Sequence, residues 1–250
     1  MKLISAEEII EFEKQQQDLD NQITNLYEQG DDANVLPMFD GVVNPINYFN
    51  SNPKILWILK EPYDGEDEFG NPNGGDMDNN KYRNALNEKL NLYRPIPTWK
   101  RIAYTSFGII NDCLYDDMDN IVMDQNKDCS VFESIKSIAF VNIKKTPGRT
   151  SSTYSDIRDA YQISRETVLK QIQLFRPEVI IGGGTLTFFM NDLDLASFKK
   201  EGHGLKYFIK NNMLYIDASH PSYPKGDARE EEYVDEIISV YRDYKKLLSK

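Results

Sequence analysis

Four short, densely apolar segments set the strongest limit on how this chain can fold. They are residues 54–60 (KILWILK), 137–143 (SIAFVNI), 178–182 (EVIIG) and 212–217 (NMLYID). Each is bounded by turn-forming residues, and each is apolar along most of its length, which indicates strands buried on both faces. Helical patterns separate these segments, and strands that alternate with helices pair in parallel through right-handed crossovers. The sequence therefore predicts an α/β fold.

The predicted helices follow the 3.6-residue spacing of apolar side chains. The first begins at a capping box formed by Ser5 and Glu8. No internal repeat and no linker divides the chain, so we expect one domain over residues 1–250. Its expected architecture is a three-layer α/β/α sandwich around a small, mostly parallel sheet of about four strands. The predicted helices cover residues 5–29, 98–114, 156–175 and 228–249, and the first and last of these are expected to pack on the core.

Few residues are available for metal or disulfide chemistry. The chain holds two cysteines, Cys113 and Cys129, and two histidines, His203 and His220. These are too few for a disulfide scaffold, an iron–sulfur cluster or a histidine-rich metal site. We therefore expect no metal or organic cofactor. The amino terminus lacks the apolar core of a signal peptide, and no apolar run reaches the roughly 18 residues needed to span a bilayer. We expect a cytoplasmic monomer that does not associate with a membrane.

The charge distribution argues against broad affinity for nucleic acids. The net charge is −11, and such affinity depends on neutralising phosphates with Lys and Arg. Residues 130–225 are an exception, because they hold thirteen Lys and Arg against nine Asp and Glu. A local basic face therefore remains compatible with the acidic total.

Polar residues follow each of the four predicted strands. Glu61, Pro62 and Tyr63 follow the first strand and Asn142 lies near the end of the second, while Gly182–Gly184 and His220–Ser222 follow the third and fourth. The carboxyl ends of parallel strands meet at one edge of an open sheet, where ligands bind in folds of this kind. The sequence thus predicts that a carboxylate, an amide, exposed backbone donors and an imidazole converge on one region.

These strand-end motifs, in this order, resemble those of the uracil-DNA glycosylase superfamily. The matching segments are ILKEPYD, FVNIKK, RPEVIIGGG and DASHPS, and the resemblance covers roughly residues 54–224. It implies that the chain hydrolyses the N-glycosidic bond of uracil, or of another damaged base, in DNA. Where many members have Asp-Pro-Tyr-His, this chain has Glu-Pro-Tyr-Asp. The cysteines that bind a cluster in some branches are missing.

The resemblance also implies roles for single residues. Glu61 matches the acidic position that stabilises the sugar cation or orients a water molecule. His220 matches the donor to the carbonyl oxygen of the departing base. Asn142 is suited to recognising the edge of an extruded base, because an amide both donates and accepts hydrogen bonds. Pro62 and Tyr63 are expected to line the base pocket.

Contacts to the phosphates that flank the target nucleotide are expected from a second set of residues. Tyr223 stands where members that open duplex DNA often present a small residue and an aliphatic wedge. The set predicted to contact phosphate or DNA is Lys144, Lys145, Gly183, Ser222 and Tyr223.

Each of these residues also has a purely structural interpretation. Glu61 could cap a turn, His220 could be satisfied by nearby backbone, and Asn142 could end its strand as turn residues do. Lys144, Lys145 and Arg149 could form a solvated loop. Two other functions therefore stay open: a hydrolase or transferase acting on a free nucleoside or nucleotide, with the acidic segment 64–80 closing over the pocket, and a binding protein on a catalytically inactive glycosylase scaffold.

Overall fold

The fold is described by a computed structural model of the chain. The described residues are 3–28, 37–62, 82–124, 127–148, 152–223 and 228–249, with only the backbone described for 28, 228 and 229. Within these residues, no helix combines the length and the apolar character needed to cross a membrane.

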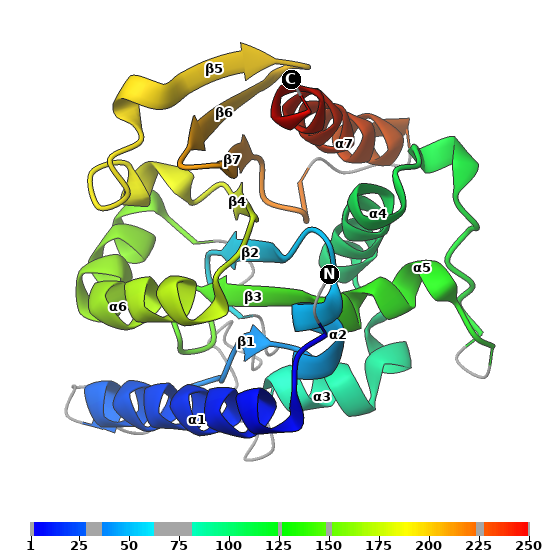
Figure 1. Cartoon of the computed structure of the whole chain (residues 1–250). Coiled ribbons are helices and arrows are strands. Elements are labelled where there is room, and N and C mark those ends of the chain that lie inside the picture. Colours follow the sequence, from blue (N-terminus) through cyan, green and yellow to red (C-terminus); the bar gives the residue numbers. More distant parts are fainter. Residues whose placement is uncertain are drawn as a thin grey trace.

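The chain forms one mixed sheet of seven strands in the order β1-β3-β2-β4-β7-β6-β5 (Figure 1). The α/β class is confirmed, and the four predicted strands form its parallel centre, β3-β2-β4-β7. The expectation of about four strands was wrong, because three antiparallel strands extend the sheet at its two edges. The strands are β1 (Gly41–Val42), β2 (Ile55–Leu59), β3 (Ile138–Asn142), β4 (Val179–Gly183), β5 (Lys199–Gly202), β6 (Leu205–Lys210) and β7 (Met213–Ala218).

The missed edge strands lack the dense apolar runs of the central ones. β1 has only two residues, and β5 has the sequence KKEG, all of it exposed or half-buried. Two-residue turns join β5 to β6 and β6 to β7. Both residues of each turn have positive φ, at His203 and Gly204 and again at Asn211 and Asn212. Such turns match the twist of paired strands, so His-Gly and Asn-Asn were the available signals for this meander.

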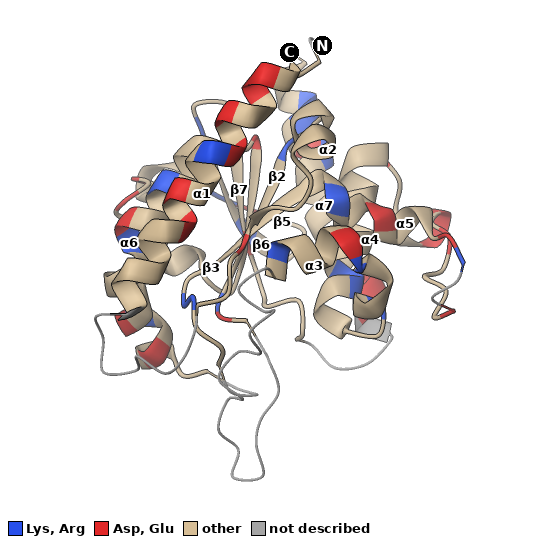
Figure 2. Ribbon diagram, turned by 90° about the horizontal axis from the view of Figure 1, so that it is seen from below, with Lys and Arg blue, Asp and Glu red and all other residues tan. Residues whose placement is uncertain are grey.

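Helices cover both faces of the sheet, as the edge-on view in Figure 2 shows. One face packs against α3, α4, α5 and α7, and the other against α1, α2 and α6. The alternation of side chains along each central strand builds both cores, so that Trp57 lies on the first face and its neighbours Leu56 and Ile58 on the second. The helices are α1 (Ala6–Glu28), α2 (Pro45–Asn50), α3 (Tyr82–Glu88), α4 (Pro97–Asn111), α5 (Ser130–Glu133), α6 (Tyr154–Phe175) and α7 (Ala228–Leu248).

The four predicted helices correspond to α1, α4, α6 and α7. The capping box before α1 is formed, because Ser5 and Glu8 exchange hydrogen bonds between side chains and backbone. Thr153 and Asp156 cap α6 in the same way. α4 ends earlier than expected, because Asp112 adopts a left-handed conformation with φ of 57° and stops the helix.

Candidate functional site

The register of the central strands aligns the residues that were predicted to form a site. Leu59 pairs with Asn142, and Gly183 pairs with Ala218. Backbone pairing continues past the strand ends, where the N–H of Lys144 donates to the carbonyl of Lys60 over 2.9 Å. Glu61 and His220 each lie two residues beyond an aligned strand end, and so the structure brings both to the carboxyl edge of the sheet.

Asn142 closes β3 with a buried carboxamide. The residue is 1% exposed, and within the described part of the chain neither its Oδ1 nor its Nδ2 has a hydrogen-bond partner. The backbone N–H of the same residue donates to Asp40 Oδ2 over 2.6 Å. By alternation along β3, the carboxamide lies on the same face of the sheet as Phe140. A buried donor and acceptor without described partners are costly in a folded protein, so this amide calls for an explanation beyond packing.

Trp99 does not offer a ring to that ligand. It is 2% exposed, and its ring packs edge-on against Phe140 at 5.1 Å between centroids. Its indole N–H donates to the hydroxyl of Tyr82 over 3.0 Å. These contacts make Trp99 part of the core behind the site.

Glu61 is fixed by an ion pair and by a glycine. Lys144 Nζ lies 3.0 Å from Glu61 Oε2, and the Glu61 side chain is 8% exposed. A Cβ atom at Gly148 would overlap the Glu61 carboxyl group, so a larger residue at 148 would displace this carboxylate from its present position. The N–H of Gly148 also donates to the carbonyl of Pro62 over 2.9 Å. Lys144, predicted as a phosphate contact, thus holds Glu61 in place.

His220 is set up as a neutral hydrogen-bond donor. Burial of the ring, and secondarily the positive charge of Lys60, lowers the pKa of His220 from 6.5 to about 4. Its Nδ1 accepts a hydrogen bond from the backbone N–H of Ser222 over 3.2 Å and lies 2.8 Å from the Ser222 hydroxyl. We assign the remaining proton to Nε2 from this pattern of hydrogen bonds. At neutral pH the residue then presents an N–H without a charge.

Side chains from two helices, α4 and α7, hold the loop that carries His220. Arg101 of α4 donates to the carbonyl of Pro221 over 2.6 Å, and Tyr233 of α7 donates to the carbonyl of Ser219 over 3.0 Å. The ring of Pro221 packs directly on Gly183. A Cβ atom placed on Gly183 would lie only 3.0 Å from Pro221 Cδ. Gly183, predicted to contact phosphate, is buried and makes room for this loop. Arg101 was not identified from the sequence, since its place in a helical pattern gave no sign of the contact.

Lys145 requires a correction, because it does not reach the surface. Its side chain is 0% exposed, and its Nζ donates to both carboxylate oxygens of Asp40, over 3.0 and 2.8 Å. Gln171 of α6 completes this buried cluster, with Oε1 at 2.8 Å from the same ammonium. Burial lowers the pKa of Lys145, while the charge of Asp40 opposes that effect. We therefore assign Lys145 to the core in place of the predicted phosphate contact.

Alternation explains why the two adjacent lysines have different roles. Consecutive residues point to opposite sides of a strand and of its immediate extension. Lys144 accordingly pairs with Glu61, while Lys145 turns toward Asp40 and α6. The sequence KK gave no indication of this difference, and Asp40 was not identified at all.

Other predicted residues have mixed outcomes. Ser222 is exposed and bonded to His220, and Tyr223 is 63% exposed beside it. Pro62 is buried next to Glu61.

Tyr63, Arg149 and the segment 64–80 lie outside the described residues. Cys113 is half-buried and Cys129 is buried, each as a free thiol.

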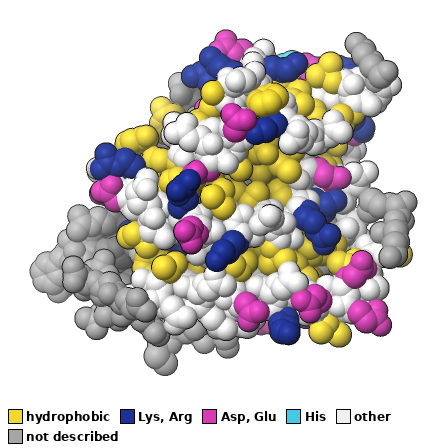
Figure 3. All heavy atoms as spheres, turned by 60° about the vertical axis from the view of Figure 1, so that its left-hand side comes forward, with side chains coloured by type: hydrophobic (Ala, Val, Ile, Leu, Met, Phe, Trp, Pro, Cys, Tyr) yellow, Lys and Arg dark blue, Asp and Glu magenta, His cyan; other side chains and the backbone are white. Residues whose placement is uncertain are grey.

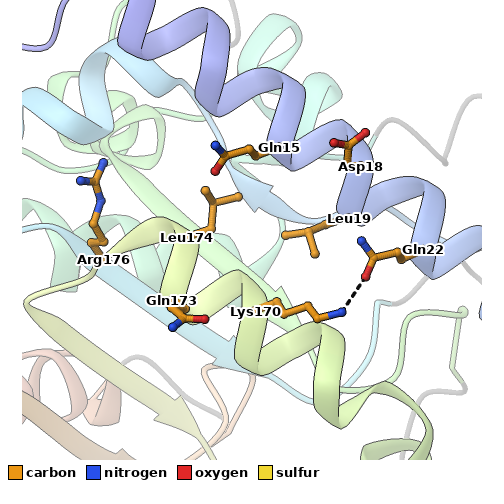
Figure 4. Close-up of a pocket in the computed structure, with 8 residues that line it drawn as sticks. All are labelled: Gln15, Asp18, Leu19, Gln22, Lys170, Gln173, Leu174 and Arg176. Atoms are coloured by element: carbon orange, nitrogen blue, oxygen red, sulfur yellow. Dashed lines mark hydrogen bonds between the residues drawn. The ribbon is translucent and has the colours of Figure 1, made fainter.

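A groove of about 570 Å³ lies elsewhere, between α1 and α6 (Figure 4). It is open and lined largely by amide and charged side chains, with Lys170 Nζ donating to Gln22 Oε1 over 2.9 Å. The wall from α6 belongs to the last turns of that helix, which lead into the start of β4. The groove therefore lies away from the carboxyl edge and contains none of the predicted site residues.

Comparison with known proteins adds no assignment, since neither a family model nor a curated protein matches the chain. Among the residues that the structure describes, no group of three or more His, Cys, Asp or Glu side chains is placed to hold a metal ion.

Proposed function

We propose that the chain hydrolyses the N-glycosidic bond of uracil, or of a related damaged base, in DNA. The observation that carries this proposal is the buried carboxamide of Asn142, whose donor and acceptor have no partner among the described residues. A pyrimidine edge offers one acceptor and one donor side by side, so a single amide can satisfy it with two hydrogen bonds. A base must leave the helical stack to reach such a buried group, as in enzymes that flip their target base.

His220 is suited to stabilise the leaving base. As the bond to the sugar breaks, negative charge develops on the base and its carbonyl oxygens. A neutral Nε2–H that points at such an oxygen lowers the energy of this charge without an initial proton transfer. The anchors of the His220 loop, Arg101 and Tyr233, keep the donor in position.

Glu61 is suited to act on the sugar and on water. Its carboxylate can stabilise the positive charge that develops at the anomeric carbon, and it can accept a proton from the attacking water. The new bond joins the water oxygen to that carbon, while the carbon–nitrogen bond breaks and its electron pair leaves with the base. Lys144 and Gly148 fix the direction of the carboxylate.

A base-release assay on single- and double-stranded oligonucleotides that carry uracil or hypoxanthine tests the proposal. We expect release that Glu61→Gln and His220→Ala each reduce by at least about a hundredfold, a typical contribution of acid–base or electrostatic catalysis. His203→Ala and Glu201→Gln are matched controls, because both residues are exposed and lie in the β5–β6 meander. No release from any substrate by the wild-type chain would contradict the proposal.

A second candidate is hydrolysis of a free nucleoside or nucleotide at the same edge. Few cations at this edge are left to bind the phosphates of a DNA strand, because Lys144 pairs with Glu61 and Lys145 pairs with Asp40. A small substrate needs fewer such contacts. Free deoxyuridine and its 5′-monophosphate are therefore included in the assay. Turnover of these compounds without release from oligonucleotides would favour this second function.

A further inference from the structure

Lys60 is a cation at the carboxyl edge that the predicted site did not include. It follows β2 and continues the face of Ile58, opposite to Leu59. In the described part of the chain, no carboxylate forms an ion pair with Lys60. Its two neighbouring cations are both engaged, since Lys144 pairs with Glu61 and Lys145 with Asp40. Among these three lysines, Lys60 is the one that forms no ion pair within the described part of the chain.

Gly184 lies beside Lys60 and leaves room there for a group of about the size of a methyl. Its φ is +69°, and its N–H donates to the carbonyl of Ala218 over 2.7 Å, which fixes the turn after β4. A Cβ placed on Gly184 would lie 3.4 Å from Lys60 Cε, 3.9 Å from Lys60 Nζ and 3.7 Å from the backbone nitrogen of His220. The space above the Gly184 Cα is therefore flanked by an ammonium group and a backbone N–H.

The backbone N–H of His220 is also available. Within the described residues it donates to no acceptor, whereas the N–H groups of Ser222 and Tyr223 in the same loop are both bonded. A positively charged side chain and a free N–H on either side of a glycine form an arrangement that suits a tetrahedral oxyanion.

We infer that the space above Gly184 is a phosphate-binding subsite, in which the Lys60 ammonium and the His220 N–H hold the oxygens of one phosphate ester. The identity of the ester as a nucleotide rests on the proposed function, because His220 belongs to both sites. A phosphate bound here would lie beside the base pocket, on the α6 side of the sheet edge. The effect of the Lys60 charge on the His220 ring supports this proximity.

Phosphate binding can be measured without any base release. The probes are inorganic phosphate, a 5′-deoxynucleoside monophosphate and a single-stranded oligonucleotide of undamaged bases, titrated by calorimetry. The variants are Lys60→Met, which removes the charge, and Gly184→Asn, which fills the space with a residue that tolerates positive φ. Lys200→Met, in the exposed strand β5, is the matched control.

We expect both site variants to weaken binding of the nucleotide probes by at least about tenfold, while Lys200→Met binds like the wild type. Tighter binding of the oligonucleotide than of the monophosphate would assign the subsite to a backbone phosphodiester, and equal binding would assign it to a terminal phosphate. Wild-type affinity in Lys60→Met, or no binding of any probe to the wild type, would overturn the inference. Binding without base release would contradict only the proposed function.

Discussion

At the scale of single residues, the proposed function depends most on one buried side chain that has no described partner, the carboxamide of Asn142. Asn142 presents a donor and an acceptor that no described part of the protein satisfies, although it is 1% exposed. Folding gains nothing from such a group, because the same volume filled by an apolar side chain would avoid the desolvation cost. Its neighbour Phe140 shows that this face of the strand accepts apolar residues.

Replacing Asn142 with leucine should therefore stabilise the fold while it removes base recognition. We expect Asn142→Leu to raise the free energy of unfolding by about 1–3 kcal/mol, the usual cost of an unsatisfied buried polar group. Urea denaturation measures this change. Asn111→Leu, at the exposed end of α4, serves as a control with little expected effect. A loss of stability in Asn142→Leu would show that the carboxamide has a structural partner.

The lowered pKa of His220 predicts that the free energy of unfolding depends on pH. Its folded pKa of about 4 lies below its ordinary value of 6.5, so the unfolded chain binds the proton first as the pH falls. His220 should therefore cost stability progressively between about pH 6.5 and 4, and this cost should be absent at neutral pH. Comparing the urea stability of the wild type and His220→Gln across this range measures it.

Ring NMR signals give the same pKa directly, since only His203 and His220 are present and a His203→Ala variant assigns them. A midpoint near 6.5 for His220 would contradict the neutral, buried donor described above.

At the scale of elements, a buried polar cluster joins five parts of the chain at the end of β3. Asp40, which precedes β1, accepts hydrogen bonds from the backbone of Asn142, from Lys145 and from Gln171 of α6. Arg83 of α3 adds a bond to the Asp40 carbonyl and an ion pair to Asp20 of α1. The end of β3 is thus tied to helices on both faces of the sheet.

Removing one partner of this cluster should be strongly destabilising. Lys145→Met leaves the Asp40 carboxylate buried and unpaired, so we expect a loss of roughly 3–5 kcal/mol in the free energy of unfolding. Lys170→Met, on the exposed side of α6, is the matched control and should change stability by less than about 0.5 kcal/mol. Wild-type stability in Lys145→Met, measured by chemical denaturation, would place this lysine outside the core.

The elements also show what the sequence could and could not predict. The central strands were predictable because a strand buried on both faces needs an unbroken apolar run, as in 54–60. β5 was missed because an exposed edge strand carries charged residues such as Lys199 and Lys200. The strand-end site followed from topology, but the different roles of Lys144 and Lys145 depended on which face each side chain reaches.

At the scale of the whole molecule, charge is dispersed. The net charge is −11, and the face shown in Figure 3 carries Lys, Arg, Asp and Glu side chains interspersed with apolar ones. Several surface cations are already paired, including Lys54 with Glu178 and Arg242 with Asp112. Under the proposed function, the contact with a nucleic acid would be small and local, because the described ion pairs engage Lys144 and Lys145 at the sheet edge.

This distribution predicts a weak dependence of oligonucleotide binding on salt. With Lys60 as the main phosphate contact, the slope of log K against log salt concentration should lie between about −0.7 and −2, because each neutralised phosphate of a single strand contributes roughly −0.7. Fluorescence anisotropy between roughly 50 and 200 mM salt measures this slope. A slope steeper than about −4 would require many more phosphate contacts than this edge provides.

The most direct test of the central claim follows the side-chain amide of Asn142 by NMR while uracil is added. The signal is identified by its loss in Asn142→Leu. We expect a saturable shift of this amide with uracil, and a much smaller one with 3-methyluracil, which lacks the N–H that the carboxamide oxygen would accept. An amide signal that neither compound moves would show that Asn142 does not bind a base.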